Sequence, residues 1–135
     1  MNNEIDCITS DHSPHDTDSK RLPFEQALPG VIGFESLLPL TLKLINEKKL
    51  SNKKLVELLS LNPSKILKLN SGTLKRKRPA DLTLIDVNKN VKLSSSLIKS
   101  KSNNFPYENL NGRGKIMLTI VDGKIVFNDR SFNIK

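Results

Sequence analysis

The stretch Glu4–His15, EIDCITSDHSPH, decides which fold class we expect for this chain. Its first eight residues form a short run that is rich in β-branched side chains and ends in a polar residue, which is consistent with a buried strand that finishes at Asp11. In α/β proteins the chemistry gathers where strands end at their carboxyl edge. The sequence therefore predicts a buried strand with Asp11 emerging at a functional edge.

The only two histidines of the chain, His12 and His15, follow this strand within a loop that also contains three acids. Carboxylate and imidazole groups are usual zinc ligands, and a carboxylate such as Asp11 can also accept a proton during catalysis. Adjacent residues at a strand end point in opposite directions, which argues against one metal held by both Asp11 and His12. An Asp-rich loop, with Asp11 and Asp16 forming local turns and the imidazoles solvated, remains an equal alternative.

Composition limits the function classes that the chain can serve. Its 135 residues correspond to about one domain, and the single Cys7 excludes an internal disulfide framework. We expect a cytoplasmic protein with no membrane partner, since neither a secretory leader nor an apolar span is evident. The net charge of +8 is dispersed apart from LKRKRP at 74–79, without interleaved aromatics, so we expect no nucleic-acid partner.

Helical periodicity dominates the first half of the chain after residue 30. Apolar residues predict a helix over 33–48, which Pro39 should kink or divide. Ser51 is a good N-cap for a second helix, and Pro63 starts a further helical turn that Gly72 would close. Helices therefore follow the first strand.

The second half changes to strand patterns. Residues 80–87 alternate as in a strand, and residues 116–127 form two apolar runs joined by Asp122-Gly123, a strong hairpin signal. The polar segment between them, 94–114, predicts a loop with one helical turn near 96–99.

Six blocks of the sequence, in order, resemble dihydroorotases of the amidohydrolase superfamily. They begin with IDCITSDHSPHDTDSKRLPFEQALPGVIGFESLLPL and continue through LSLNPSKILKL, GTL, PADLTLIDV, KSKSNNFPY and GKIMLTIVDGKIVF. The resemblance implies an α/β fold: the C-terminal part of a (β/α)8 TIM-barrel amidohydrolase, followed by part of a small β-sandwich domain. Residues 1–70 would supply the last barrel strand, active-site loop and closing helices, and residues 71–135 the β domain.

The same resemblance implies roles for individual residues. Asp11 would be a zinc ligand and the catalytic, proton-transferring group. His15 would contact the substrate carboxylate, and the backbone at Pro29 and Gly30 would bind the substrate ring. His12 matches a motif position that we interpret as structural, and we expect Glu35 to be a buried acid at a helix start that caps backbone amides.

The implied reaction is reversible hydrolysis of the cyclic amide of dihydroorotate to N-carbamoyl-aspartate in pyrimidine biosynthesis, with one or two zinc ions. The other metal ligands of the family lie upstream of the matched segment, so we expect this chain alone to be inactive. Two alternatives remain: an allantoinase- or hydantoinase-type enzyme, and a non-catalytic partner of aspartate carbamoyltransferase. A homodimer is a further possible assembly.

Three structural expectations accompany this assignment. The strands at 80–87 and 116–127 would present unpaired edges, which is an aggregation hazard. The apolar faces formed by Leu37, Leu38, Leu55 and Leu58 would lack part of their partner surface. Lys77 stands where the family carries glycine, so it is strained if that turn needs a positive φ.

Overall fold

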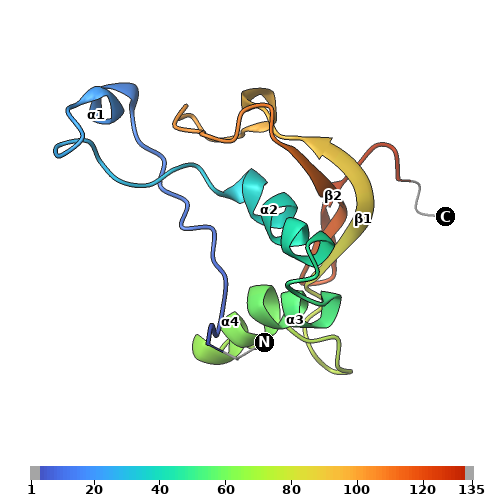
Figure 1. The fold of residues 1–135 in the computed structure, drawn as a ribbon. Coiled ribbons are helices and arrows are strands. Elements are labelled where there is room, and N and C mark those ends of the chain that lie inside the picture. The colour runs from blue at the N-terminus through green and yellow to red at the C-terminus, as the bar shows by residue number, and fades with distance from the viewer. Residues whose placement is uncertain (1–3, 133–135) are drawn as a thin grey trace.

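The computed structural model describes residues 4–132, in which helices precede a three-stranded antiparallel sheet of order β1-β2-β3 (Figure 1). The extended N-terminal segment runs along one side of α2, and the sheet lies on the other. The elements are α1 (Thr17–Arg21), α2 (Phe34–Asn46), α3 (Asn52–Val56), the π-helical η1 (Glu57–Leu61), α4 (Asn62–Ile66), β1 (Leu82–Lys92), the 3-10 turn η2 (Ser95–Leu97), β2 (Asn111–Val121) and β3 (Lys124–Asn128).

The predicted buried strand at the start of the chain is wrong for this structure. Residues 4–11 are extended but belong to no strand, and Ile5 is 62% exposed. A strand needs hydrogen-bonded neighbours, and within residues 4–132 only His12 finds one, in a parallel bridge to Val31. The segment is held instead by a helical region, because the Ile8 amide donates to the carbonyl of Leu58 over 3.0 Å.

Helix α2 confirms the helix predicted over 33–48, but Pro39 does not divide it. Proline removes one backbone hydrogen bond from a helix interior. Here Pro39 is buried against β2, where a Cβ atom placed on Gly112 would lie 2.9 Å from the proline Cβ. Packing on the sheet thus offsets the lost hydrogen bond and keeps the helix in one piece.

A second glycine of β2 sets how closely α2 approaches the sheet. Gly114 is buried with φ +98°, and a Cβ atom at this position would lie 2.0 Å from Cδ1 of Leu42. A side chain at this position would be strained by the positive φ and would displace Leu42. This contact is part of the small core, whose buried apolar side chains include Ile32, Leu42, Leu55, Leu58 and Leu93.

The helical region after α2 begins as predicted and ends differently. The Ser51 hydroxyl accepts the Lys54 amide over 3.2 Å, which confirms the N-cap. The chain then stays helical to Ile66, and Lys68, with φ +55°, makes the left-handed closing turn expected at Gly72. The Leu69 amide donates to the Ser64 carbonyl over 2.8 Å, so the helix end is satisfied before Gly72 is reached.

Two of the leucines expected to lack partners are well covered. Leu55 is 6% exposed and Leu58 is 3% exposed. Both lie in the helical region onto which the N-terminal segment docks through the carbonyl of Leu58. The expectation of a bare apolar face is therefore wrong for these two positions.

The sheet confirms the predicted hairpin and extends it. Asp122 and Gly123 have φ of +49° and +74°, and they join Val121 to its partner Lys124 in a two-residue turn. β1 continues past the predicted end at residue 87, and β2 starts before residue 116, because their polar ends pair with each other through contacts such as Asn90 with Arg113. Because these paired residues are polar, the strand ends lack the alternation of apolar side chains from which a strand is predicted.

Three smaller expectations are also resolved. β1 and β3 are the edges of the sheet formed by residues 4–132, as expected for unpaired strands. Lys77 adopts φ +64°, so the turn does require the conformation that favours glycine. The predicted helical turn in the polar loop is present as η2, and no helix in the described part of the chain is long and apolar enough to cross a membrane.

Candidate functional site

The structure brings together three of the predicted site residues, His15, Pro29 and Gly30, although fourteen positions separate the first two. The His15 ring nitrogen Nε2 lies 2.8 Å from the Pro29 carbonyl oxygen. Because a carbonyl only accepts hydrogen bonds, Nε2 must carry the proton. The two loops are also joined by the Ser13 amide, which donates to Val31 over 2.9 Å.

Gly30 is required by this close approach. Its φ is +100°, and a Cβ atom here would lie 2.5 Å from Cβ of Ser13 and 3.8 Å from Nε2 of His15. The glycine thus allows backbone to pack directly against the His15 loop. Lys20 donates from Nζ to the carbonyls of Leu28, over 2.6 Å, and of Gly30, over 3.2 Å, which holds the loop from the other side.

Asn104 completes the cluster, and the sequence reasoning assigned it no role. Its Nδ2 donates to the Ser13 carbonyl over 2.8 Å and approaches the Gly30 carbonyl at 3.4 Å. Its Oδ1 accepts the His15 amide over 3.2 Å. The available signal was its position in KSKSNNFPY, one of the six matched blocks, but nothing local connects that block to the histidine loop.

His12 faces the start of α2 rather than His15. Its Nδ1 accepts the Gly33 amide over 3.2 Å, and its ring stacks on Phe34 with centroids 3.8 Å apart. These contacts fix the entry to the helix, in line with the structural role expected for His12. The ring nitrogen that accepts a hydrogen bond is thereby occupied by the backbone.

Glu35 binds a backbone amide that the sequence did not predict. Its Oε1 accepts the amide of Lys99 over 2.9 Å, so it anchors the distant loop rather than capping its own helix. Its Oε2 is buried and has no hydrogen-bond partner within residues 4–132. The expected capping of the helix start is therefore corrected to a contact between α2 and the loop that carries Asn104.

The carboxylate of Asp11 takes no part in these contacts within residues 4–132. The residue is exposed, has φ +42°, and accepts the Ser13 hydroxyl at its backbone carbonyl over 3.1 Å. Residues 4–132 contain no group of three His, Cys, Asp or Glu side chains that could hold a metal. The described residues therefore form no metal site by themselves, and the role of Asp11 as a ligand stays a prediction.

Asp16 serves the local backbone. Its carboxylate accepts the Ser19 amide over 2.8 Å and the Ser19 hydroxyl over 2.5 Å, which caps the short helix α1. The side-chain and backbone hydrogen bonds from Ser19 lower the pKa of Asp16 below its usual 3.8. For this residue the turn-forming alternative is confirmed.

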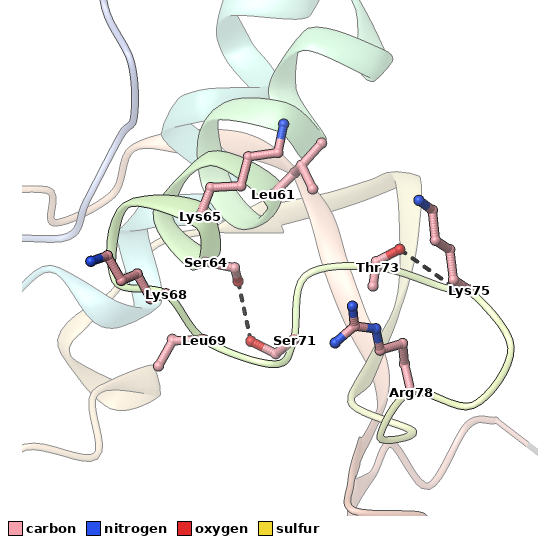
Figure 2. Close-up of a pocket in the computed structure, with 9 residues that line it drawn as sticks. All are labelled: Leu61, Ser64, Lys65, Lys68, Leu69, Ser71, Thr73, Lys75 and Arg78. Atoms are coloured by element: carbon pink, nitrogen blue, oxygen red, sulfur yellow. Dashed lines mark hydrogen bonds between the residues drawn. The ribbon is translucent and has the colours of Figure 1, made fainter.

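A pocket of about 470 Å³ lies elsewhere, between the end of α4 and the loop that leads to β1 (Figure 2). It has a basic lining without an acid or a histidine, and Figure 2 shows the amino groups of Lys65 and Lys68 directed away from each other. It shares no residue with the cluster around His15. Its lining consists of Leu61, Ser64, Lys65, Lys68, Leu69, Ser71, Thr73, Lys75 and Arg78.

Comparison with known proteins identifies the family of the chain. Residues 16–126 match the model of the amidohydrolase family, and the chain belongs to that family. Among curated proteins it is 46% identical over 122 residues to a dihydroorotase of Geotalea daltonii, covering 90% of this chain and 29% of that protein. A dihydroorotase of Aquifex aeolicus is 43% identical over 125 residues, with 93% and 29% covered. The chain thus spans about 30% of the length of these relatives.

Solved structures share the fold. An L-hydantoinase (dihydropyrimidinase) from Arthrobacter aurescens superposes with a TM-score of 0.84 at 30% identity, over 92% of this chain and 29% of that one. A dihydropyrimidinase from Brevibacillus agri reaches a TM-score of 0.85 at 20% identity, over 91% and 28%. The chain therefore shares the arrangement of its segments with part of each of these two structures.

Proposed function

We propose that this chain provides part of the active site of a dihydroorotase, which reversibly hydrolyses the cyclic amide of dihydroorotate to N-carbamoyl-aspartate in pyrimidine biosynthesis in the cytoplasm. The observation that carries the proposal is the contact between His15 and the Pro29–Gly30 loop, which joins the histidine loop to the segment that the resemblance assigns to the same substrate. The curated dihydroorotases, 35–46% identical, support the same substrate class.

His15 and Gly30 would bind the substrate. His15 already donates Nε2–H to the Pro29 carbonyl, so binding a carboxylate through Nδ1 requires the imidazolium, which donates from both nitrogens. The carbonyls of Leu28, Pro29 and Gly30 are all engaged by side chains, whereas no hydrogen bond from the Gly30 amide occurs within residues 4–132. The Gly30 amide can therefore donate to a ring carbonyl of the substrate.

Asp11 would move the proton. Hydrolysis adds water to the amide carbon and breaks the C–N bond, so one proton must travel from the water to the departing nitrogen. A carboxylate at the mouth of the site can take that proton and return it. Asp11 is exposed within residues 4–132, so its carboxylate is accessible for this proton transfer.

A bound zinc ion would polarise the scissile carbonyl. Residues 4–132 supply Asp11 and no complete ligand set, so the other ligands of one or two ions would come from the part of a barrel outside these residues. In this proposal residues 1–70 belong to the end of a (β/α)8 barrel and residues 71–135 to its small β domain. A homodimer or a complex with aspartate carbamoyltransferase would be compatible assemblies.

The test is turnover by the full-length protein with dihydroorotate, hydantoin and allantoin as competing substrates. We expect dihydroorotate to have the highest kcat/KM. A higher kcat/KM for hydantoin would instead identify the protein as a hydantoinase-type enzyme. Absence of turnover on all three would favour a non-catalytic partner.

The role of Asp11 has a matched control in the same loop. Asp11→Asn removes the proton acceptor, so kcat should fall by about 10²-fold or more. Asp18→Asn makes the same change at an exposed acid on α1 with no assigned role and should leave kcat within about twofold. Equal effects of the two substitutions would remove Asp11 from the mechanism.

A further inference from the structure

We infer that Asn104 is a positioning residue for substrate binding: it locks the His15 loop to the Pro29–Gly30 loop and so sets where both substrate-binding groups lie. The geometry of this inference comes from the structure alone. Its effect on kinetics rests on the proposed function. Asn104 comes from the loop after η2, 89 residues beyond His15.

The amide group of Asn104 satisfies three partners with the polarity that each needs. Its oxygen receives the His15 amide, and its nitrogen donates to the Ser13 carbonyl, with the Gly30 carbonyl at 3.4 Å. Only a side chain with both an acceptor and a two-hydrogen donor can do this at once. Asparagine is therefore specified by chemistry as well as by size.

The backbone of Asn104 is fixed at the same point. Its carbonyl accepts the Ile32 amide over 3.1 Å, and Ile32 is fully buried. Five residues earlier, the amide of Lys99 is held by Glu35 at the start of α2. Two hydrogen bonds thus attach this loop to the segment that follows Gly30, one at Ile32 and one at Glu35. Asn104 therefore reaches both substrate-binding loops from a rigid base.

The position of the His15 ring depends on this lock. The ring reaches Pro29 through Nε2, while the His15 backbone is held by Asn104. If the two loops separate, the ring cannot keep its bond to Pro29 and face a substrate carboxylate, and the Gly30 amide shifts at the same time. A displacement of about 1 Å at such a site can cost up to about a hundredfold in rate.

The experiment compares Asn104→Ala and Asn104→Asp with Asn103→Ala in the full-length protein. Asp has the size of Asn and keeps the acceptor for the His15 amide, but it cannot donate to the two carbonyls. We expect both Asn104 variants to raise KM for dihydroorotate about tenfold to a hundredfold, with a smaller change in kcat. Asn103 is exposed and makes no side-chain hydrogen bond within residues 4–132, so its variant should match the parent protein.

A purely space-filling role would give a different pattern. In that case Asn104→Asp would keep the parental KM while Asn104→Ala would lower the melting temperature, and this outcome would overturn the inference. Parental KM in both Asn104 variants would overturn it as well.

Hydrogen exchange separates this inference from the proposed function. The His15 amide should lose protection in Asn104→Ala and keep more of it in Asn104→Asp, whatever reaction the protein catalyses. If the parent protein does not turn over dihydroorotate but the exchange pattern holds, the function is wrong and the lock remains. Unchanged exchange of the His15 amide in Asn104→Ala would refute the lock itself.

Discussion

Single residues decide whether the His15 loop and the Pro29–Gly30 loop can meet, and Gly30 makes the sharpest prediction. Gly30→Ala adds a methyl group 2.5 Å from Cβ of Ser13 at φ +100°. We expect the left-handed conformation to cost about 1–2 kcal/mol of unfolding free energy and the overpacking about 1–3 kcal/mol more. KM for dihydroorotate should rise in parallel, because the loop can fit the new methyl only by moving away from His15.

Gly123 provides the matched control for that substitution. It also has a positive φ, +74°, but a Cβ atom there would meet nothing within 4 Å. Gly123→Ala should therefore show the conformational cost without the overpacking and with no change in KM. Denaturant unfolding and steady-state kinetics measure the two effects, and equal destabilisation by both variants would mean that the Ser13 contact relaxes freely.

Residues differ in how far the sequence could predict their contacts. Motif matching selected His15, Pro29 and Gly30, and the structure places them together. Asn104 could not be assigned because its partners lie 74 to 91 positions away, and a hydrogen bond over that separation leaves no local pattern. Glu35 was assigned to the correct type of partner, a backbone amide, but on the wrong segment.

Secondary-structure elements were predictable where their signals are local. The Ser51 cap and the Asp122-Gly123 turn are local features, and both are confirmed. The strand expected before Asp11 failed because a strand depends on neighbours rather than on its own residues. The left-handed turn at Lys68, which follows the end of the helix, was missed because a lysine at positive φ has no sequence signal comparable to that of glycine.

The β2–β3 hairpin carries an ion pair that predicts how its stability depends on pH. Asp129 follows β3, and its Oδ2 lies 2.5 Å from Nζ of Lys115 in β2. The hydrogen bond from Lys115, followed by those from Ser131, lowers the pKa of Asp129 well below its usual 3.8. A lowered folded-state pKa adds stability that is fully present above pH 3.8 and is lost as the pH falls toward the folded-state value.

Asp129→Asn should therefore flatten the decline of the melting temperature below about pH 4 and have its largest effect near neutral pH. Lys115→Met alone should lower the neutral-pH melting temperature similarly. Adding it to Asp129→Asn should change little further if the pair acts as one unit. Thermal melts between pH 2 and 7 measure this, and additive effects of the two substitutions would show that the ion pair contributes nothing.

At the scale of the whole molecule, the described chain has an open sheet and a small core. β3 is an edge strand with every residue exposed, and among the large apolar side chains of residues 4–132 only Ile32 and Leu93 are fully buried. Open edges pair with other chains unless they are charged or covered. The open β3 edge should therefore let the 135-residue chain by itself self-associate.

Val126→Lys tests whether this association uses the strand edge. Val126 is 61% exposed on β3, and lysine at an edge strand opposes pairing with a second chain. We expect the concentration at half-association to rise about tenfold, equivalent to about 1.4 kcal/mol. Val56→Lys is the matched control, because Val56 is 57% exposed but lies on α3 and offers no strand edge. Light scattering over a concentration series measures both variants. If Val56→Lys were equally effective, the association would depend on exposed apolar area or net charge and not on the β3 edge.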